Sequence, residues 1–222
     1  MKKFRLLAIC VFLIGLPCFG QNQKVPIKVA PKKTAQAPSK QPLAVQNISE
    51  TEWSEIVKAF NDEDWDKSLR LVSLSQNKLK AENANKELAR LRYLHLYSLA
   101  GKVVDGKATY DDLAKYATPM IGKEFLMPSR EISTDCVRKL NYICPVAGND
   151  KALRVSAINK SATSIITFDY IIMIEKLDVA ANSGKQLFLS GKLKKVELNP
   201  TQSTIWIMRL FFENGVGLLI KK

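Results

Sequence analysis

Cys136 and Cys144 are the two residues whose type and spacing most plainly allow a covalent bond. Two more of the four cysteines, Cys10 and Cys18, lie in the apolar start of the chain. An even pair of cysteines in an exported chain is typical of a disulfide bond. Positions eight apart come within about 6 Å only if the chain reverses between them. A helical segment would instead bury both thiols on one face, and a redox role is the third alternative.

Other residues that could carry chemistry are few. His95 is the only histidine, whereas a zinc site needs three or four ligands and a Ser-His-Asp triad needs a neighbouring nucleophile. Ser75 and Lys78 match the Ser-x-x-Lys spacing of penicillin-recognising enzymes, but no Lys-Thr-Gly or Ser-Asp-Asn element accompanies them. The acidic residues of segment 62–66 lack the glycine and distal glutamate of a calcium loop. We therefore expect no enzyme activity, no metal and no cofactor.

The first 20 residues have the three-part layout of a cleaved secretory signal. Lys2, Lys3 and Arg5 form a basic start, residues 6–16 are apolar, and small residues precede Gln21. The apolar stretch is shorter than the roughly twenty residues that a helix needs to span a bilayer. We therefore expect export to the periplasm or the outside of the cell, with a mature chain that begins at Gln21.

Cys18 raises the question of a lipid anchor, because a cysteine after a bacterial signal can become the lipid-modified first residue of a lipoprotein. The processing motif resembles Leu, a small residue, Gly or Ala, then Cys. Here Gly15, Leu16 and Pro17 precede Cys18, and two of these positions depart from the motif. We do not expect lipoprotein anchoring through Cys18.

The net charge of +13 is unevenly placed. Segment 21–47 contains five lysines, no acidic residue and no apolar period, and is predicted to be a disordered Pro/Lys-rich linker. Segment 48–130 has equal numbers of acidic and basic residues, so the remaining excess follows residue 130. An exported chain seldom meets nucleic acid, so the charge predicts weak attraction to anionic surfaces, with specific binding of an acidic polymer or lipid headgroup as the alternative.

Four helices are predicted in segment 49–123. Ser49 and Glu52, and later Thr109 and Asp112, have capping-box spacing. Apolar residues then recur at three- and four-residue steps. The expected helices run from about residue 49 to 60, 65 to 79, 84 to 100 and 109 to 121, and Gly101 is expected to stop the third.

These helices carry a family resemblance. An aromatic residue closes one helix, another opens its partner, and further aromatic and small residues follow, namely Phe60, Trp65, Tyr97, Ala100, Gly101 and Tyr110. Segment 52–123 thereby resembles the tetratricopeptide and related helical-repeat families, although their Trp-x-x-Leu-Gly signature is absent. The resemblance implies two antiparallel helical hairpins that form a scaffold for binding other proteins.

After Met127 and Pro128 the apolar period changes to two, which predicts strands. They are expected at 153–157, 165–174, 186–198, 205–212 and 216–220. Asn214-Gly215 predicts a hairpin between the last two, and the apolar phase slips at Lys194 and Lys195, which predicts a β-bulge. Without helical crossovers, these strands indicate a small antiparallel sandwich or barrel.

The predicted fold is therefore α+β, with a signal at 1–20, a linker at 21–47, a helical-hairpin domain at 48–127 and an antiparallel β domain at 128–222. We expect a non-catalytic binding or assembly protein of the bacterial envelope that holds a protein partner in a helical groove. Trp53, Trp65 and Tyr97 are the candidate anchors, because aromatic residues dominate binding hot spots; each could instead belong to the core.

The main alternative is a β module that binds carbohydrate or an anionic headgroup, with the helices as a spacer. Lys192, Lys194 and Lys195 are its candidate anionic-ligand patch, although a polar outer strand face is the simpler interpretation. An unfamiliar enzyme is the third. The sequence does not specify the partner or the oligomeric state.

Overall fold

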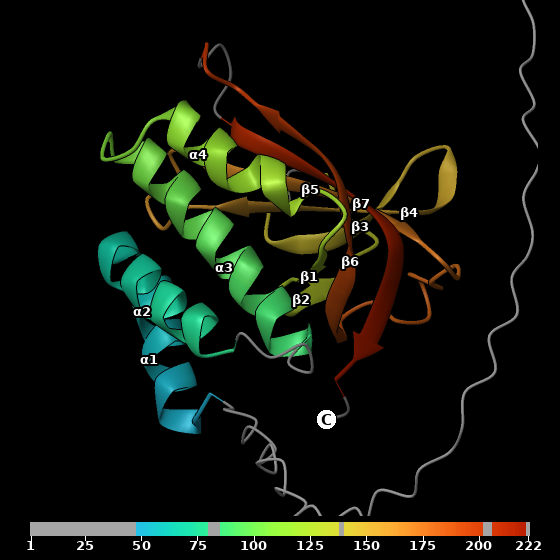
Figure 1. Cartoon of the computed structure of the whole chain (residues 1–222). Coiled ribbons are helices and arrows are strands. Elements are labelled where there is room, and N and C mark those ends of the chain that lie inside the picture. The colour runs from blue at the N-terminus through green and yellow to red at the C-terminus, as the bar shows by residue number, and fades with distance from the viewer. Residues whose placement is uncertain (1–47, 80–84, 138–139, 202–205, 221–222) are drawn as a thin grey trace, which may run out of the picture. The chain divides into compact units, whose positions relative to one another are not determined.

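A computed structural model describes residues 48–79, 85–137, 140–201 and 206–220. In these residues four helices precede a seven-stranded sheet, which makes the fold mixed α+β (Figure 1). The helices are α1 (Glu50–Asn61), α2 (Trp65–Lys78), α3 (Asn85–Val104) and α4 (Tyr110–Ala117), with a 3-10 turn at Thr118–Met120. The predicted signal and linker lie outside the described residues.

Side-chain caps start the helices where the sequence predicts them. The Ser49 hydroxyl accepts from the backbone N–H of Glu52, whose carboxylate accepts from the backbone N–H of Ser49, which confirms the first capping box. Thr109 and Asp112 form the same arrangement before α4. Such caps satisfy N–H groups that have no partner inside the helix.

Gly101 does not stop α3, which continues to Val104. A Cβ atom at position 101 would lie 2.4 Å from Cε2 of Trp65. The glycine therefore makes room for the buried indole ring rather than ending the helix. The expectation of a helix stop is wrong because packing, and not helix propensity, determines the residue type here.

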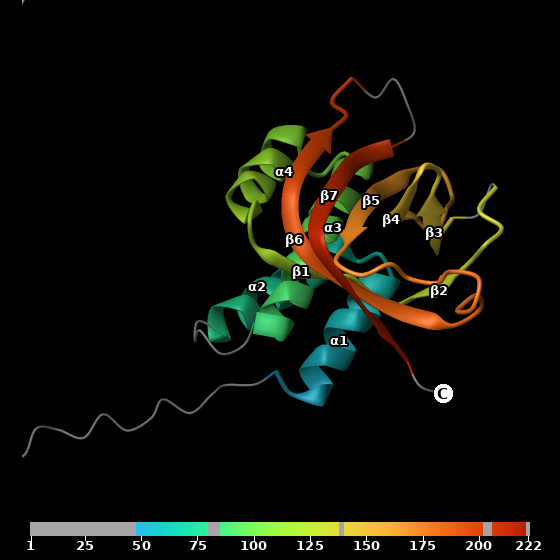
Figure 2. The same cartoon turned by 90° about the vertical axis from the view of Figure 1, so that its right-hand side faces the viewer.

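The sheet is closed into a barrel. Its strands are β1 (Glu124–Leu126), β2 (Arg130–Ile132), β3 (Tyr142–Val146), β4 (Asn149–Ile158), β5 (Ile165–Met173), β6 (Gln186–Leu198) and β7 (Trp206–Leu219). Their order is β1-β6-β2-β3-β4-β5-β7, and an additional β6–β7 pairing closes the ring. Figure 2 shows β6 and β7 curving side by side across the molecule.

Two of the strand pairings are parallel, β2 with β3 and β5 with β7. The expectation of a wholly antiparallel sheet is wrong at these two places. β6 follows β5 in the chain but pairs with β7 and not with β5. The chain runs back along β6 before it enters β7. β7 can therefore lie parallel to β5 without a helical crossover.

Asn214-Gly215 is not a hairpin turn, because β7 continues through both residues. Ser190 and Lys192 of β6 pair with Val216 and Glu213, so β7 has one extra residue at this place. Asn214 has a positive φ of 55°, as the first residue of one common bulge type does. The Asn-Gly signal therefore marks a β-bulge rather than the predicted hairpin.

The predicted third strand is confirmed as β6, with the bounds that the sequence gives. Leu193 and Lys195 pair with the adjacent residues Phe212 and Phe211 of β7, which leaves Lys194 as an extra residue in β6. This register shift confirms the bulge predicted at the lysine pair.

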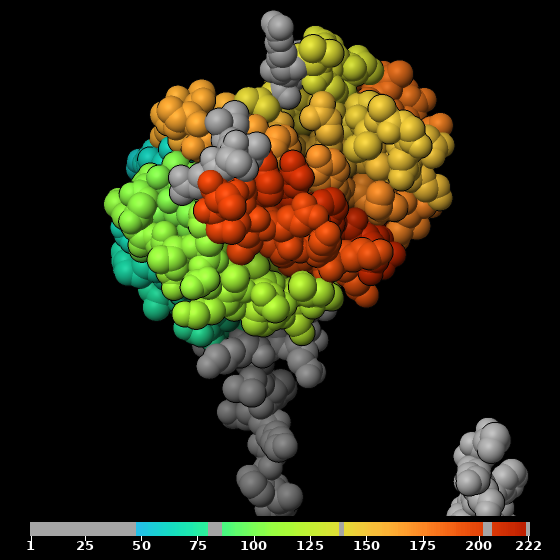
Figure 3. Space-filling model, turned by 90° about the horizontal axis from the view of Figure 1, so that it is seen from above, coloured from blue at the N-terminus to red at the C-terminus, as the bar shows by residue number. Residues whose placement is uncertain are grey.

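Helices and barrel share one hydrophobic core. Its largest cluster of buried side chains contains Trp65 and residues of α3 and α4 together with residues from the inner face of the barrel. α3 contacts β1, β5 and β7, and α4 contacts β6. Seen from above, green helical residues and orange-to-red strand residues lie against one another (Figure 3). A smaller cluster joins α1, α2 and the first part of α3.

Candidate functional site

The disulfide between Cys136 and Cys144 is present, with a Cα–Cα distance of 5.9 Å. Cys136 lies in the segment after β2 and Cys144 lies in β3. The two Cα atoms are therefore as close as a disulfide bond requires. An Nη2 group of Arg154 donates to the carbonyl oxygen of Cys136 at 3.2 Å and holds this segment against β4.

Two of the three candidate anchors are in the core. Trp65 and Tyr97 are each 4 % exposed, and both rings contact Phe60, with centroid distances of 6.0 and 4.9 Å. The Tyr97 hydroxyl donates to the carbonyl oxygen of Ile158 at 3.4 Å. In this structure these two rings pack the helices onto the barrel and present no binding surface.

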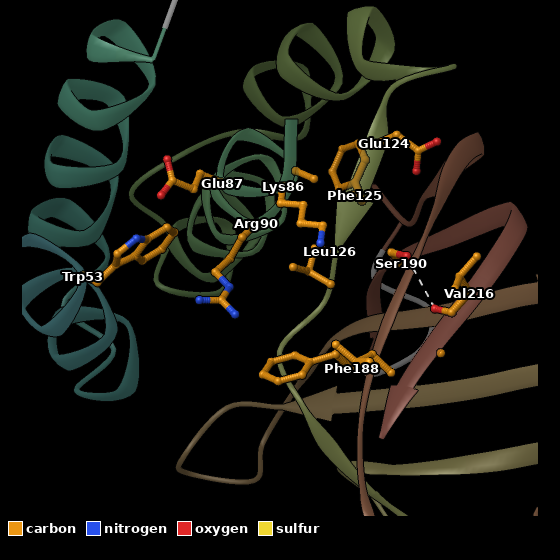
Figure 4. A pocket seen from close by; sticks show the side chains of 13 residues that line it. Trp53, Lys86, Glu87, Arg90, Glu124, Phe125, Leu126, Phe188, Ser190 and Val216 are labelled. Atoms are coloured by element: carbon orange, nitrogen blue, oxygen red, sulfur yellow. Dashed lines mark hydrogen bonds between the residues drawn. The ribbon is translucent and has the colours of Figure 1, made fainter. Parts of the chain in front are cut away.

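The third candidate, Trp53, lines a groove of about 670 Å³ between the helices and the barrel. The lining comes from α1, the start of α3, β1, β6 and β7, with Trp53, residues of segment 86–90, segment 124–126, Phe188, Ser190 and segment 216–218. Figure 4 shows Trp53 and Arg90 on the helical side and Phe188 on the barrel side directed toward one another. Most of the lining is apolar, which is typical of sites that bind organic ligands or peptide side chains.

Arg90 occupies the centre of the groove. Its Cζ atom lies 5.1 Å from the centroid of the Trp53 ring and 5.4 Å from that of Phe188. Figure 4 shows the guanidinium group between the two rings. Among the described residues Arg90 has no ion pair. An arginine presents its N–H groups in a planar fork that matches a carboxylate, so this side chain can pair with an acidic ligand group.

Charged and apolar side chains surround Arg90. Lys86 and Glu124 are exposed at the groove, and Arg92 donates to the carbonyl oxygen of Glu124 at 3.0 Å. On the barrel side Val216 and Leu218 are 52 % and 68 % exposed. Large apolar side chains this exposed, next to a concave apolar surface, are typical of protein interaction sites.

The three lysines of the predicted anionic-ligand patch lie on the outer face of β6. Lys194 is 3.3 Å from a carboxylate oxygen of Glu213 and Lys195 is 2.7 Å from one of Glu197. The exposed Lys192 pairs in register with Glu124 and Glu213. Each lysine therefore has an acidic neighbour, which is typical of a polar outer strand face.

His95 packs between helices. Its ring stacks on Tyr116 with centroids 3.8 Å apart, and its Nδ1 is 3.2 Å from Oε1 of Gln76. Burial lowers the pKa of His95 to about 4, so the ring is neutral at neutral pH. Neither His95 nor Asp169, whose pKa burial raises, lines the groove.

Neither a metal-binding cluster nor a membrane-spanning helix occurs in the described part of the chain. No group of three or more His, Cys, Asp or Glu side chains there is placed to hold a metal ion. Within 48–79, 85–137, 140–201 and 206–220, no helix has the length and apolar character needed to cross a membrane.

Sequence reasoning missed most of the groove. Arg90 and Phe188 are almost a hundred residues apart in the chain, and only the closure of the barrel brings them together. The one usable signal is the apolar character of segment 216–220, which predicts an ordinary strand.

Comparisons with protein-family models, with curated proteins and with solved structures find no significant match for this chain.

Proposed function

We propose that this protein is an exported, non-catalytic binding or assembly factor of the bacterial envelope, and that the groove around Arg90 holds a segment of a protein partner. The observation that carries the proposal is the position of the Arg90 guanidinium between the rings of Trp53 and Phe188, in a largely apolar groove. Aromatic residues and arginine are the residue types that contribute most to binding hot spots.

The surroundings of Arg90 indicate the chemistry of the partner segment. Apolar side chains would contact Leu126, Val216 and Leu218, which line the groove around the cation. A carboxylate would pair with the open edge of the guanidinium. Such a charge-assisted pair is shielded from water by the two rings, so it contributes more than an exposed ion pair does.

Export is part of the proposal. The Cys136–Cys144 disulfide supports it, because such bonds persist in oxidising compartments. N-terminal sequencing of the protein recovered outside the cytosol should give Gln21 as the first residue. Recovery of the whole protein from the cytosol with Met1 in place and both thiols free would contradict export.

The helical part of the proposal is that α1 to α4 form two hairpins of the tetratricopeptide kind. Contacts of α1 with α2 and of α3 with α4 support this arrangement. In such a scaffold the residues that bind a partner lie on the exposed surface of the helices, where Trp53 and Arg90 contribute to the groove.

Affinity purification from an envelope extract tests the binding role. The wild-type chain should retain a partner that Arg90→Gln loses, because glutamine keeps a polar side chain but removes the cation. Arg70→Gln is the matched control, since Arg70 is an exposed arginine on α2 that does not line the groove. Equal retention by wild type and both variants would contradict the proposal.

A further inference from the structure

The last part of β7 has a free edge. On one side, residues 216–219 pair with β6. On the other side, the pairing with β5 ends at Met173 and Gly215, and the backbone N–H of Ile174 donates to the carbonyl oxygen of Gly215. Beyond Gly215, no described strand pairs with this side of β7. Figure 1 shows this part of β7 as the red arrow beside β6.

The register with β6 identifies which backbone groups face the free edge. The N–H of Ile220 donates to the carbonyl oxygen of Gln186 at 3.0 Å. Because hydrogen-bonding residues alternate along an antiparallel pair, Leu218 and Val216 also direct their N–H and C=O groups to β6. The N–H and C=O groups of Gly217 and Leu219 therefore point to the free edge.

The side chains along this edge are apolar and exposed. Val216, Leu218 and Ile220 are 52 %, 68 % and 40 % exposed, and their alternation places all three on one face of the strand. No charged residue or proline occurs from Asn214 to Ile220. Natural proteins usually protect an edge strand with such residues, so this edge is suited to pairing with another strand.

We propose that a second copy of this chain pairs with this edge, β7 against β7, around a twofold axis at Leu218. In the antiparallel register centred there, Gly217 of each copy faces Leu219 of the other. The two pairs exchange four backbone hydrogen bonds. Leu218 faces its own symmetry mate and Val216 faces Ile220, so each exposed apolar side chain contacts another.

This internal match favours a second copy over a strand from another protein. A twofold contact requires a surface that is complementary to itself, and the hydrogen-bonding residues and the apolar residues are each symmetric about position 218. No like charges in 214–220 would oppose the contact. Val216 and Leu218 also line the groove, so this proposal and the proposed function share these two side chains. The backbone pairing at Gly217 and Leu219, and its test in the purified protein, require no groove partner.

Sedimentation equilibrium of the protein purified from the full-length chain tests the dimer. The average mass should rise with concentration from that of one chain toward that of two. Leu218→Lys places two like charges opposite each other at the axis, so the dissociation constant should rise at least about tenfold. Leu74→Lys is the matched control, since Leu74 is 52 % exposed on α2, and it should leave the dissociation constant unchanged.

Residue-resolved amide hydrogen exchange tests the register. The amides of Gly217 and Leu219 should exchange fast at low concentration and slowly in the dimer. The amides of Leu218 and Ile220 face β6 and should stay slow in both states. A mass of one chain at every concentration, a dimer that Leu218→Lys leaves unchanged, or a dimer without new protection at Gly217 and Leu219 would each overturn the proposal.

Discussion

The hydroxyl group of Tyr93 on α3 donates a hydrogen bond of 2.7 Å to Oδ2 of Asp169 on β5. Tyr93 is 2 % exposed and Asp169 is fully buried. Oδ1 of the same carboxylate accepts from the Thr167 hydroxyl at 2.6 Å. The pair therefore joins a helix to the inner face of the barrel through a charge that has little contact with water.

This contact predicts a pH-dependent stability. Burial raises the pKa of Asp169 to about 6, although hydrogen bonds from Thr167 and Tyr93 and the charge of Arg130 act in the opposite direction. An unfolded aspartate titrates near pH 4, so the folded protein binds more protons between about pH 4 and 6. The contribution of Asp169 to the free energy of unfolding is present below about pH 4 and is lost as the pH rises through about 6.

Asp169→Asn should remove this slope. Relative to wild type, the variant should gain on the order of 2 to 3 kcal/mol of unfolding free energy between pH 4 and pH 7, measured by urea denaturation at each pH. Tyr93→Phe is the control, because it keeps the carboxyl group and removes a hydrogen bond that lowers its pKa. In this variant the pH range over which the free energy of unfolding falls should extend to higher pH. A difference between wild type and Asp169→Asn that does not change with pH would contradict this account.

The titration of His95 changes the free energy of unfolding with pH in the opposite direction, so its contribution has to be separated from that of Asp169. Its folded pKa of about 4 lies below the unfolded value near 6.5. The contribution of His95 is therefore present above about pH 6.5 and is lost as the pH falls through about 4. Wild-type stability should change little where the two slopes overlap, whereas Asp169→Asn should become more stable with rising pH.

Gly101→Ala should destabilise the protein even though alanine is the better helix former. Helix propensity favours the change by about 1 kcal/mol, but the added Cβ would lie 2.4 Å from the Trp65 ring. Overpacking of this kind costs about 1 to 3 kcal/mol or more. We expect a lower unfolding midpoint by chemical denaturation.

A double-mutant cycle checks the cause of that loss. In the background of Trp65→Leu the ring is absent, so adding Gly101→Ala should cost much less than it does in wild type. Equal costs in the two backgrounds would show that the indole ring is not the reason for the glycine.

The Cys136–Cys144 disulfide should stabilise the protein by about 2.5 kcal/mol in the chain-entropy model for a short loop. Denaturation of wild type with and without reductant measures this difference. The double variant Cys136→Ser, Cys144→Ser should match reduced wild type and should not respond to reductant. If reduction leaves the wild-type transition in place, the bond contributes nothing to stability.

Local signals predicted local structure well. The capping boxes at Ser49 and Thr109 and the bulge at the lysine pair each depend on a few neighbouring residues, and the structure contains all three. The hairpin predicted at Asn214-Gly215 was wrong because the backbone preference of these residues suits a bulge as well as a turn. Whether these two residues form a bulge or a turn depends on β5 and β6, which flank β7 at this point and lie far away in sequence.

The site was harder to predict than the elements. Trp53, Trp65 and Tyr97 are all aromatic and all on helices, and sequence alone does not tell which ones the barrel covers. Arg90 becomes a binding candidate only because β6 brings Phe188 beside it. The short distance between Arg90 and Phe188 follows from the closed strand order, which no local sequence pattern specifies.

Site-specific photo-crosslinking tests the central claim, that the groove holds a segment of a protein partner. A photoreactive amino acid at Leu126 lies within the groove, and the same residue at the exposed Leu74 on α2 is the control. We predict an adduct with a different protein at Leu126, its loss in the presence of Arg90→Gln, and no such adduct at Leu74. The same adducts at both positions, or an adduct at Leu126 that Arg90→Gln does not weaken, would contradict the claim.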